Sequence, residues 1–181
     1  MTDPEKHATK RRNANRRYMT RAWPAVGVLV LFGVTLGTGC AGGGGAELSR
    51  THLIQRGDAA CRRQYVAFGR MKVGPEPDLV YPTARDLKAA QVDSAQLLSL
   101  IRPLARDLAS LHPPRADARD YRTLVTGVQA ELGDTEREQQ AATRNDARDA
   151  LKQEIEREHQ SGIWGALATR MGFQVCGAQT I

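Results

Sequence analysis

The apolar residues that follow residue 46 recur at the spacing of an α-helix. The segment from about Glu47 to Met71 has few β-branched residues and no strict alternation of apolar and polar positions, which argues against a strand. The proline-rich segment 73–82 ends this first predicted helix. Its larger apolar residues are separated by seven, four and three positions, so we expect one shared face: Ile54, Cys61, Tyr65 and Phe68.

The second predicted helix begins at a clear capping signal. Thr83 and Asp86 have the spacing of a capping box, in which each residue's side chain bonds the other's backbone N–H. A leucine-rich helical stripe follows as far as Leu111, and the sequence His112-Pro113-Pro114 ends the helix. Pro103 should bend the helix, because it removes one backbone hydrogen bond and crowds the preceding turn.

The third predicted helix begins near Arg115, and two places compete for its end. Residues 133–135 read as a stop followed by a new cap, whereas residues 143–146 read as a turn. We prefer the later break, because it gives four helices of similar length that pack well as antiparallel neighbours. The residues expected to face inward are Tyr121, Leu124, Val125, Val128 and Leu132.

The last predicted helix covers about Asp146 to Met171. Gly172 suits the left-handed position after a helix, and Phe173 should fold back on the last turn. The inward residues are expected to be Ala147, Ala150, Leu151 and Ile155. We therefore predict an all-α protein in which residues 47–177 form a four-helix antiparallel bundle, followed by a short tail at 178–181. In an up-down-up-down bundle the first and last helices are neighbours.

The N-terminal part of the chain has the pattern of an export signal. Residues 1–21 are polar and basic, and residues 22–38 carry no charge. A basic region, an apolar region and small residues before a cleavage point are typical of a secretory signal peptide. An uncleaved transmembrane anchor is the alternative, since about 20 apolar residues span a bilayer. In either case the positive-inside bias places the following domain outside the cytoplasm.

The net charge of the whole chain gives a misleading picture of the domain. The formal charge is +6, which by itself suggests nucleic-acid binding. Seven of the 26 basic residues precede the apolar segment, however, and from Cys40 onward the chain has 19 basic and 18 acidic residues. A nearly neutral domain lacks the concentrated positive field that binding to a phosphate backbone requires. We therefore expect no nucleic-acid partner.

A cysteine follows directly after the apolar segment. Leu36-Gly37-Thr38-Gly39-Cys40 resembles the lipobox of bacterial lipoproteins, although Gly37 stands where that motif usually has an aliphatic residue. The resemblance implies cleavage after residue 39, lipid modification of Cys40 and attachment to the membrane on its extracytoplasmic face. Residues 40–46, with four consecutive glycines, would then be a flexible tether. Plain secretion without a lipid is the remaining alternative.

The remaining cysteines are accounted for if Cys40 carries a lipid. Cys61 and Cys176 are then the exported pair, and an oxidising compartment favours a disulfide between them. Two separate buried thiols are the alternative. The layout from residue 47 to residue 177, with a cysteine in the first helix and a final Gly172–Gly177 segment, also resembles uncharacterised helical lipoproteins of high-GC bacteria. This second resemblance implies a fold and a location but no activity.

No catalytic or cofactor motif stands out in the sequence. Phosphate-binding, dinucleotide-binding and nucleophile-elbow motifs are absent. Glu156 and His159 have the spacing of di-iron ligands, but the second copy that such sites need is missing, so we expect no metal. Carboxylate pairs such as Glu154 and Glu158 are interpreted as a solvated helix face. An enzyme would need a titratable cluster inside the bundle, which the pattern does not predict.

Trp164 lies between two glycines and admits two interpretations. It fills the core near the disulfide, or it is an exposed contact for a partner or ligand, since tryptophan is enriched at binding hot spots. Taken together, the sequence predicts a non-enzymatic, lipid-anchored envelope protein that acts through protein–protein contacts. The alternative hypothesis is a carrier or sensor that holds a small apolar ligand or haem between its helices.

Overall fold

The computed structural model describes residues 46–71, 74 and 77–178 of the chain. The chain divides into two compact units, Met1–Ala41 and Gly42–Ile181, and the described residues all belong to the second. The predicted signal segment 1–39, Cys40 and nearly all of the predicted tether therefore lie outside the described residues.

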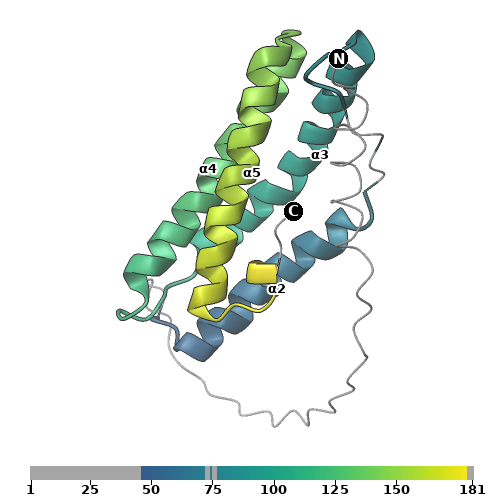
Figure 1. Cartoon of the computed structure of the whole chain (residues 1–181). Helices are drawn as coiled ribbons and strands as arrows, with labels where there is room; N and C mark the ends of the chain where they lie inside the picture. Colours follow the sequence, from purple (N-terminus) through teal and green to yellow (C-terminus); the bar gives the residue numbers. More distant parts are fainter. Residues whose placement is uncertain (1–45, 72–73, 75–76, 179–181) are drawn as a thin grey trace, which may run out of the picture. The chain divides into compact units, whose positions relative to one another are not determined.

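The described residues form four α-helices and one short 3-10 helix (Figure 1). These are α2 (Arg50–Phe68), α3 (Ala84–Ala109), α4 (Ala118–Thr143), α5 (Ala147–Met171) and η2 (Cys176–Ala178). No strand occurs in this part of the chain. The prediction of an all-α, four-helix antiparallel bundle with one disulfide is confirmed. None of the described helices is long and apolar enough to cross a membrane.

The predicted helix ends are confirmed by their caps. The backbone N–H of Thr83 donates to the Asp86 carboxylate (2.8 Å), and that of Asp86 donates to the Thr83 hydroxyl (3.3 Å). α4 runs without interruption to Thr143, so the later of the two candidate breaks is correct and the break at residues 133–135 is wrong. Asn145 turns the chain with a φ of 57°, and Gly172 ends α5 with a φ of 95°.

The helices pack in chain order rather than as a closed ring. α3, α4 and α5 lie side by side, with α4 in extensive contact with the other two (Figure 1). α2 crosses them at an angle and packs on α3 and η2. Direct contact between α2 and α5 is sparse, so the expectation that the first and last helices are neighbours is wrong. The reason is that the segment following α5 covers the inner face of α2 at Gly57 and Asp58.

Two clusters of buried apolar side chains form the core. The larger cluster draws on all four helices and on the C-terminal segment, and includes Leu53, Leu108, Leu124, Val128, Trp164 and Phe173. The smaller cluster joins Leu79 to residues of α3, α4 and α5, and includes Leu87, Ala90, Ala141 and Ala150. α3 continues through Pro103, whose ring lies on the exposed side of the helix.

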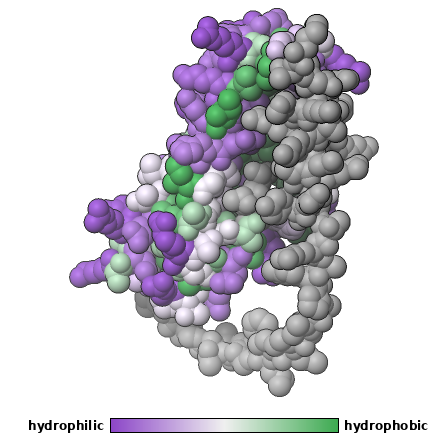
Figure 2. Space-filling view, viewed as in Figure 1, coloured by the Kyte–Doolittle hydropathy of each residue, from purple (hydrophilic) through white to green (hydrophobic). Residues whose placement is uncertain are grey.

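Two predicted inward residues lie outside instead. Ile155 is 59% exposed and Tyr65 is 62% exposed. In α5 the inward row is polar at its centre, where Gln153 and Ser161 are buried, so the apolar Ile155 falls on the outer side. Hydrophobic side chains follow this outer side of α5 in Figure 2. In α2 the buried residues are mostly small, and they are Leu53, Gly57, Asp58, Ala60, Cys61 and Gln64.

Candidate functional site

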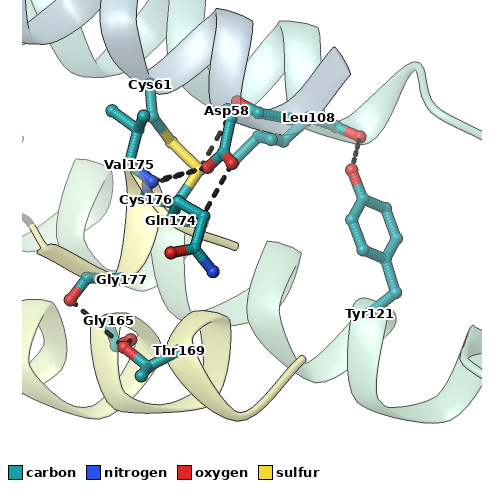
Figure 3. The surroundings of a disulfide bond; sticks show 11 residues. Asp58, Cys61, Leu108, Tyr121, Gly165, Thr169, Gln174, Val175, Cys176 and Gly177 are labelled. Carbon is teal, nitrogen blue, oxygen red and sulfur yellow. Dashed lines mark hydrogen bonds between the residues drawn. A yellow bond between two sulfur atoms is a disulfide. The ribbon is translucent and has the colours of Figure 1, made fainter. Parts of the chain in front are cut away.

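The predicted disulfide between Cys61 and Cys176 is confirmed (Figure 3). It links α2 to the first residue of η2, with 5.2 Å between the two Cα atoms and a separation of 115 residues. Both cysteines are fully buried. The alternative of two separate buried thiols is therefore wrong. We refer to Cys61–Cys176 as the staple.

A carboxylate next to the staple holds the same C-terminal segment. Asp58 lies three residues before Cys61 on α2 and accepts hydrogen bonds from the backbone N–H groups of Gln174 (2.9 Å), Val175 (2.8 Å) and Cys176 (3.2 Å) (Figure 3). Successive backbone N–H groups that point at one anion form a favourable binding concavity, which here is occupied by a side chain of the same protein. Two residues within one turn of α2, Asp58 and Cys61, thus hold the C-terminal segment, the first by hydrogen bonds and the second by the disulfide.

A close approach between α2 and the C-terminal segment depends on a glycine. A Cβ at Gly57 would lie 2.3 Å from Cε1 of Phe173, so any larger residue would displace the ring. Phe173 is 2% exposed and stacks near Tyr121, with 6.5 Å between ring centroids. The Tyr121 hydroxyl in turn donates to the carbonyl of Leu108 (2.7 Å). Phe173 therefore folds into the core as predicted.

Trp164 lies inside the bundle, which confirms that it fills the core near the disulfide and corrects the alternative interpretation of it as an exposed partner or ligand contact. Its side chain is 1% exposed and belongs to the same apolar cluster as the staple. The indole N–H donates to the carboxylate of Glu131 on α4 (2.5 Å). Gly127 lets α4 approach the tryptophan, because a Cβ there would lie 2.8 Å from the Trp164 Cβ. The two glycines that flank Trp164 in the sequence do not predict its contact with Gly127, which lies on another helix.

Glu131 belongs to a row of buried polar residues between α4 and α5, which we call the polar seam. Its members are Glu131, Asp134, Thr135 and Glu138 of α4 and Gln153, Arg157 and Ser161 of α5. Arg157 Nε donates to the Glu138 carboxylate (3.2 Å), and Arg137 pairs with Asp134 and donates to Gln153 (2.9 Å). The expectation that the bundle holds no titratable cluster is therefore wrong.

Burial dominates the electrostatics of the polar seam. It raises the pKa of Glu131 and of Glu138, and the nearby Arg157 guanidinium partly offsets the increase in both pKa values. Each carboxylate nevertheless has a hydrogen-bonding or ionic partner inside the protein, and both glutamate residues are at most 5% exposed. Residues closed off from solvent in this way are suited to fixing the register of two helices rather than to meeting a substrate.

The predicted metal-ligand spacing does not form a site. His159 is exposed and Glu156 pairs with Lys152 at 3.9 Å, so this pair faces away from the interior of the bundle. No group of three or more histidine, cysteine, aspartate or glutamate residues in the described ranges is placed to hold a metal ion. His52 and His112 are both exposed.

The surface of α2 on the side away from the bundle has a groove. Its apolar lining comes from Ile54, Ala59, Val66 and Ala67. Three arginines also line it, and Asp58 lines its edge next to the C-terminal segment. Gln174, which the Asp58 carboxylate holds through its backbone, lines the groove beside α2. Comparison of this chain with protein-family models, curated proteins and solved structures finds no match. The function is therefore inferred from the sequence and the geometry of this chain.

Proposed function

We propose that this protein is a non-enzymatic lipoprotein of the cell envelope, attached through a lipid on Cys40 to the extracytoplasmic face of the membrane, and that it acts through protein–protein contacts. The observation that carries the proposal is the buried staple. Disulfides persist in oxidising compartments and are rare in the cytosol. With Cys61 and Cys176 paired, Cys40 is the one cysteine left for modification.

The rigidity of the folded unit supports a role in binding. The C-terminal segment is fixed by the staple and by three hydrogen bonds to Asp58, and α4 and α5 are joined by the polar seam. Titratable groups of the seam are closed off from solvent, which favours a structural role for them. A rigid domain on a flexible tether presents its surface to partners at low entropic cost.

Mass spectrometry of the protein extracted gently from its own membrane tests the attachment. We expect a mass that begins at Cys40 and includes acyl chains, and an increase on reduction and alkylation that corresponds to two thiols. A Cys40→Ala variant is the matched control, and it should lose the lipid but keep the disulfide. A native chain that retains residues 1–39 would contradict lipid attachment at Cys40. Free thiols at Cys61 and Cys176 would contradict an oxidising compartment.

Cross-linking in intact cells tests the mode of action. The protein is compared with a secreted form, in which a signal peptide that is cleaved without lipid attachment replaces residues 1–40, because both share the same folded unit. Under the proposal, a defined partner is cross-linked to the anchored protein and much less to the secreted form, which is not held at the membrane. A small apolar molecule that co-purifies with the folded protein, in place of a protein partner, would contradict the proposal.

A further inference from the structure

The charge of the folded unit is unevenly distributed among its helices. α2 has four arginines and a single acidic residue, and that residue, Asp58, is buried and bonded to the C-terminal segment. α4, by contrast, has five acidic and three basic residues, and α5 has four of each. Two of the four arginines form ion pairs with other helices or loops, Arg50 with Asp117 and Arg63 with Asp107. The positive charge on the outward face of α2 therefore comes from Arg56 and Arg62, while the domain as a whole is nearly neutral.

The groove on this face combines positive charge with apolar surface. It has a volume of about 880 Å³, is open to solvent along α2, and has the apolar lining described above. Arg63 on its rim is paired with Asp107 (2.8 Å), whereas Arg62 and Arg70 have no ion pair among the residues that the structure describes. Beside them Tyr65 and Val66 are 62% and 43% exposed. The groove thus presents positive charge beside exposed apolar side chains, and both features contribute to binding at an anionic lipid surface.

A lipid on Cys40 would keep the start of α2 near the bilayer. The chain is fixed to the bundle from Glu47 onward, since the Glu47 carboxylate accepts from the backbone N–H of Arg115 (2.7 Å) and the N–H of Leu48 donates to the carbonyl of His112 (2.9 Å). Cys40 lies seven residues earlier, so a fully extended chain spans at most about 25 Å between them. α2 is about 28 Å long and is the first helix after this connection.

We propose that the outward face of α2 docks on the anionic phospholipid surface of the membrane to which the chain is attached. Arg62 and Arg70 contact lipid phosphates, while the apolar lining of the groove, which includes Val66, receives the upper part of an acyl chain. This docking rests on the membrane attachment proposed above. It assigns a specific orientation to the domain, with α2 toward the bilayer and the outer side of α5 available to partners.

Quenching by brominated lipids tests the contact. The full chain is purified in detergent and reconstituted into vesicles of phosphatidylcholine and phosphatidylglycerol in equal parts, or of phosphatidylcholine alone. Val66→Trp reports on the α2 face, and Ile163→Trp on α5 is the matched control, because the two positions are 43% and 47% exposed. The emission of the unmodified protein, in which Trp164 follows the cleavage point, is subtracted.

We expect brominated lipid to quench the emission added at position 66 several times more than that added at position 163, and only in the anionic vesicles. Replacing both Arg62 and Arg70 by glutamine should lower the ratio of docked to undocked domain by about thirtyfold, since each arginine near an anionic surface contributes about 1 kcal/mol. Salt at about 1 M, where the Debye length is about 3 Å, should have a similar effect.

The outcomes separate the docking from the attachment. Equal quenching at positions 66 and 163, in vesicles that still carry the protein through flotation, would overturn the docking and leave the attachment intact. Loss of the protein from the vesicles would contradict both. Quenching at position 66 that is the same without phosphatidylglycerol or without the two arginines would overturn the electrostatic contact. If the tryptophan at position 66 is shielded from solvent in native membranes but not in vesicles of pure lipid, this face binds an acidic protein partner. That result would also overturn the docking.

Discussion

Replacement of Asp58 by alanine should release the C-terminal segment from α2 at a measurable cost in stability. The carboxylate is 8% exposed and accepts from the N–H groups of Gln174, Val175 and Cys176. Cys176 is fully buried, whereas Gln174 is exposed and Val175 is half-buried. Removal of the carboxylate therefore leaves one N–H without an acceptor away from water, while the other two regain access to solvent.

The magnitude follows from these surroundings. A buried N–H that loses its acceptor costs about 1–3 kcal/mol, and each of the other two hydrogen bonds contributes about 0.5–1.5 kcal/mol net. The expected decrease in the free energy of unfolding is about 4 kcal/mol for Asp58→Ala. Since small domains are stable by about 5–15 kcal/mol, this loss would be a large fraction of the total. Asp58→Asn keeps one oxygen acceptor and should lose about half as much.

Urea denaturation followed by far-ultraviolet circular dichroism measures the loss. Asp120→Ala is the control, because this aspartate lies exposed in the first turn of α4 and should change the midpoint little. All variants should keep the helicity of the parent protein in the absence of urea. A decrease of less than about 1 kcal/mol for Asp58→Ala would refute the reasoning, since it would mean that the staple alone fixes the segment.

Four further outcomes follow from the contacts in the core. Glu131→Gln keeps an acceptor for the Trp164 indole and should be tolerated, whereas Glu131→Leu strands the buried N–H and should cost about 1–3 kcal/mol. Burial raises the pKa of Glu131, so the folded state binds its proton more tightly than the unfolded state. Unfolding midpoints measured from pH 7 toward 4.5 should therefore rise relative to those of Glu131→Gln, and parallel profiles would contradict this. Gly57→Ala should cost about 1–3 kcal/mol in urea denaturation, because its Cβ meets the Phe173 ring; a gain would mean that the ring moves freely. Reduction of the disulfide should cost about 4–5 kcal/mol in the same assay, and an unchanged midpoint would argue against its structural role.

The helix boundaries were predictable because capping is local. The box between Thr83 and Asp86, the turn at Asn145 and the left-handed Gly172 each depend on residues no more than a few positions apart. The choice between the two breaks in the third predicted helix was different, because both places have local stop signals, and it depended on the similar helix lengths that a bundle favours. A single sequence contains all the information that these features need.

Tyr121, Leu124 and Val128 of α4 and Ala150 of α5 are buried as predicted, but the polar part of these two inward faces was not predictable by the same means. Hydrophobic periodicity selects the side with the most apolar residues, and at the centre of α5 that side includes the exposed Ile155. The true inward row is polar there, and it is stabilised by partners on α4, such as Glu138 for Arg157. Buried charge is tolerated only when it is paired, and the pairing joins residues 19 positions apart.

Part of the candidate site was likewise predictable from the sequence, and part was not. Pairing of Cys61 with Cys176 followed from counting cysteines, whereas the role of Asp58 depends on backbone groups 116 to 118 residues away. Nothing in the arginine-rich sequence around Asp58 distinguishes it from a surface charge. Its distance of three residues from Cys61 on one face was the only available signal, and this spacing is too common to be specific.

The two faces of α2 connect stability with the proposed orientation of the domain. α2 packs mainly on α3, and at its inner face the staple and Asp58 add the C-terminal segment, so these contacts decide how firmly the helix is held. Its outward arginines act as one surface only while the helix keeps a fixed direction. Reduction of the staple should therefore weaken lipid contact at Val66 before it lowers the helicity of the long α4–α5 pair. In this view the disulfide preserves the geometry of a binding surface as well as the fold.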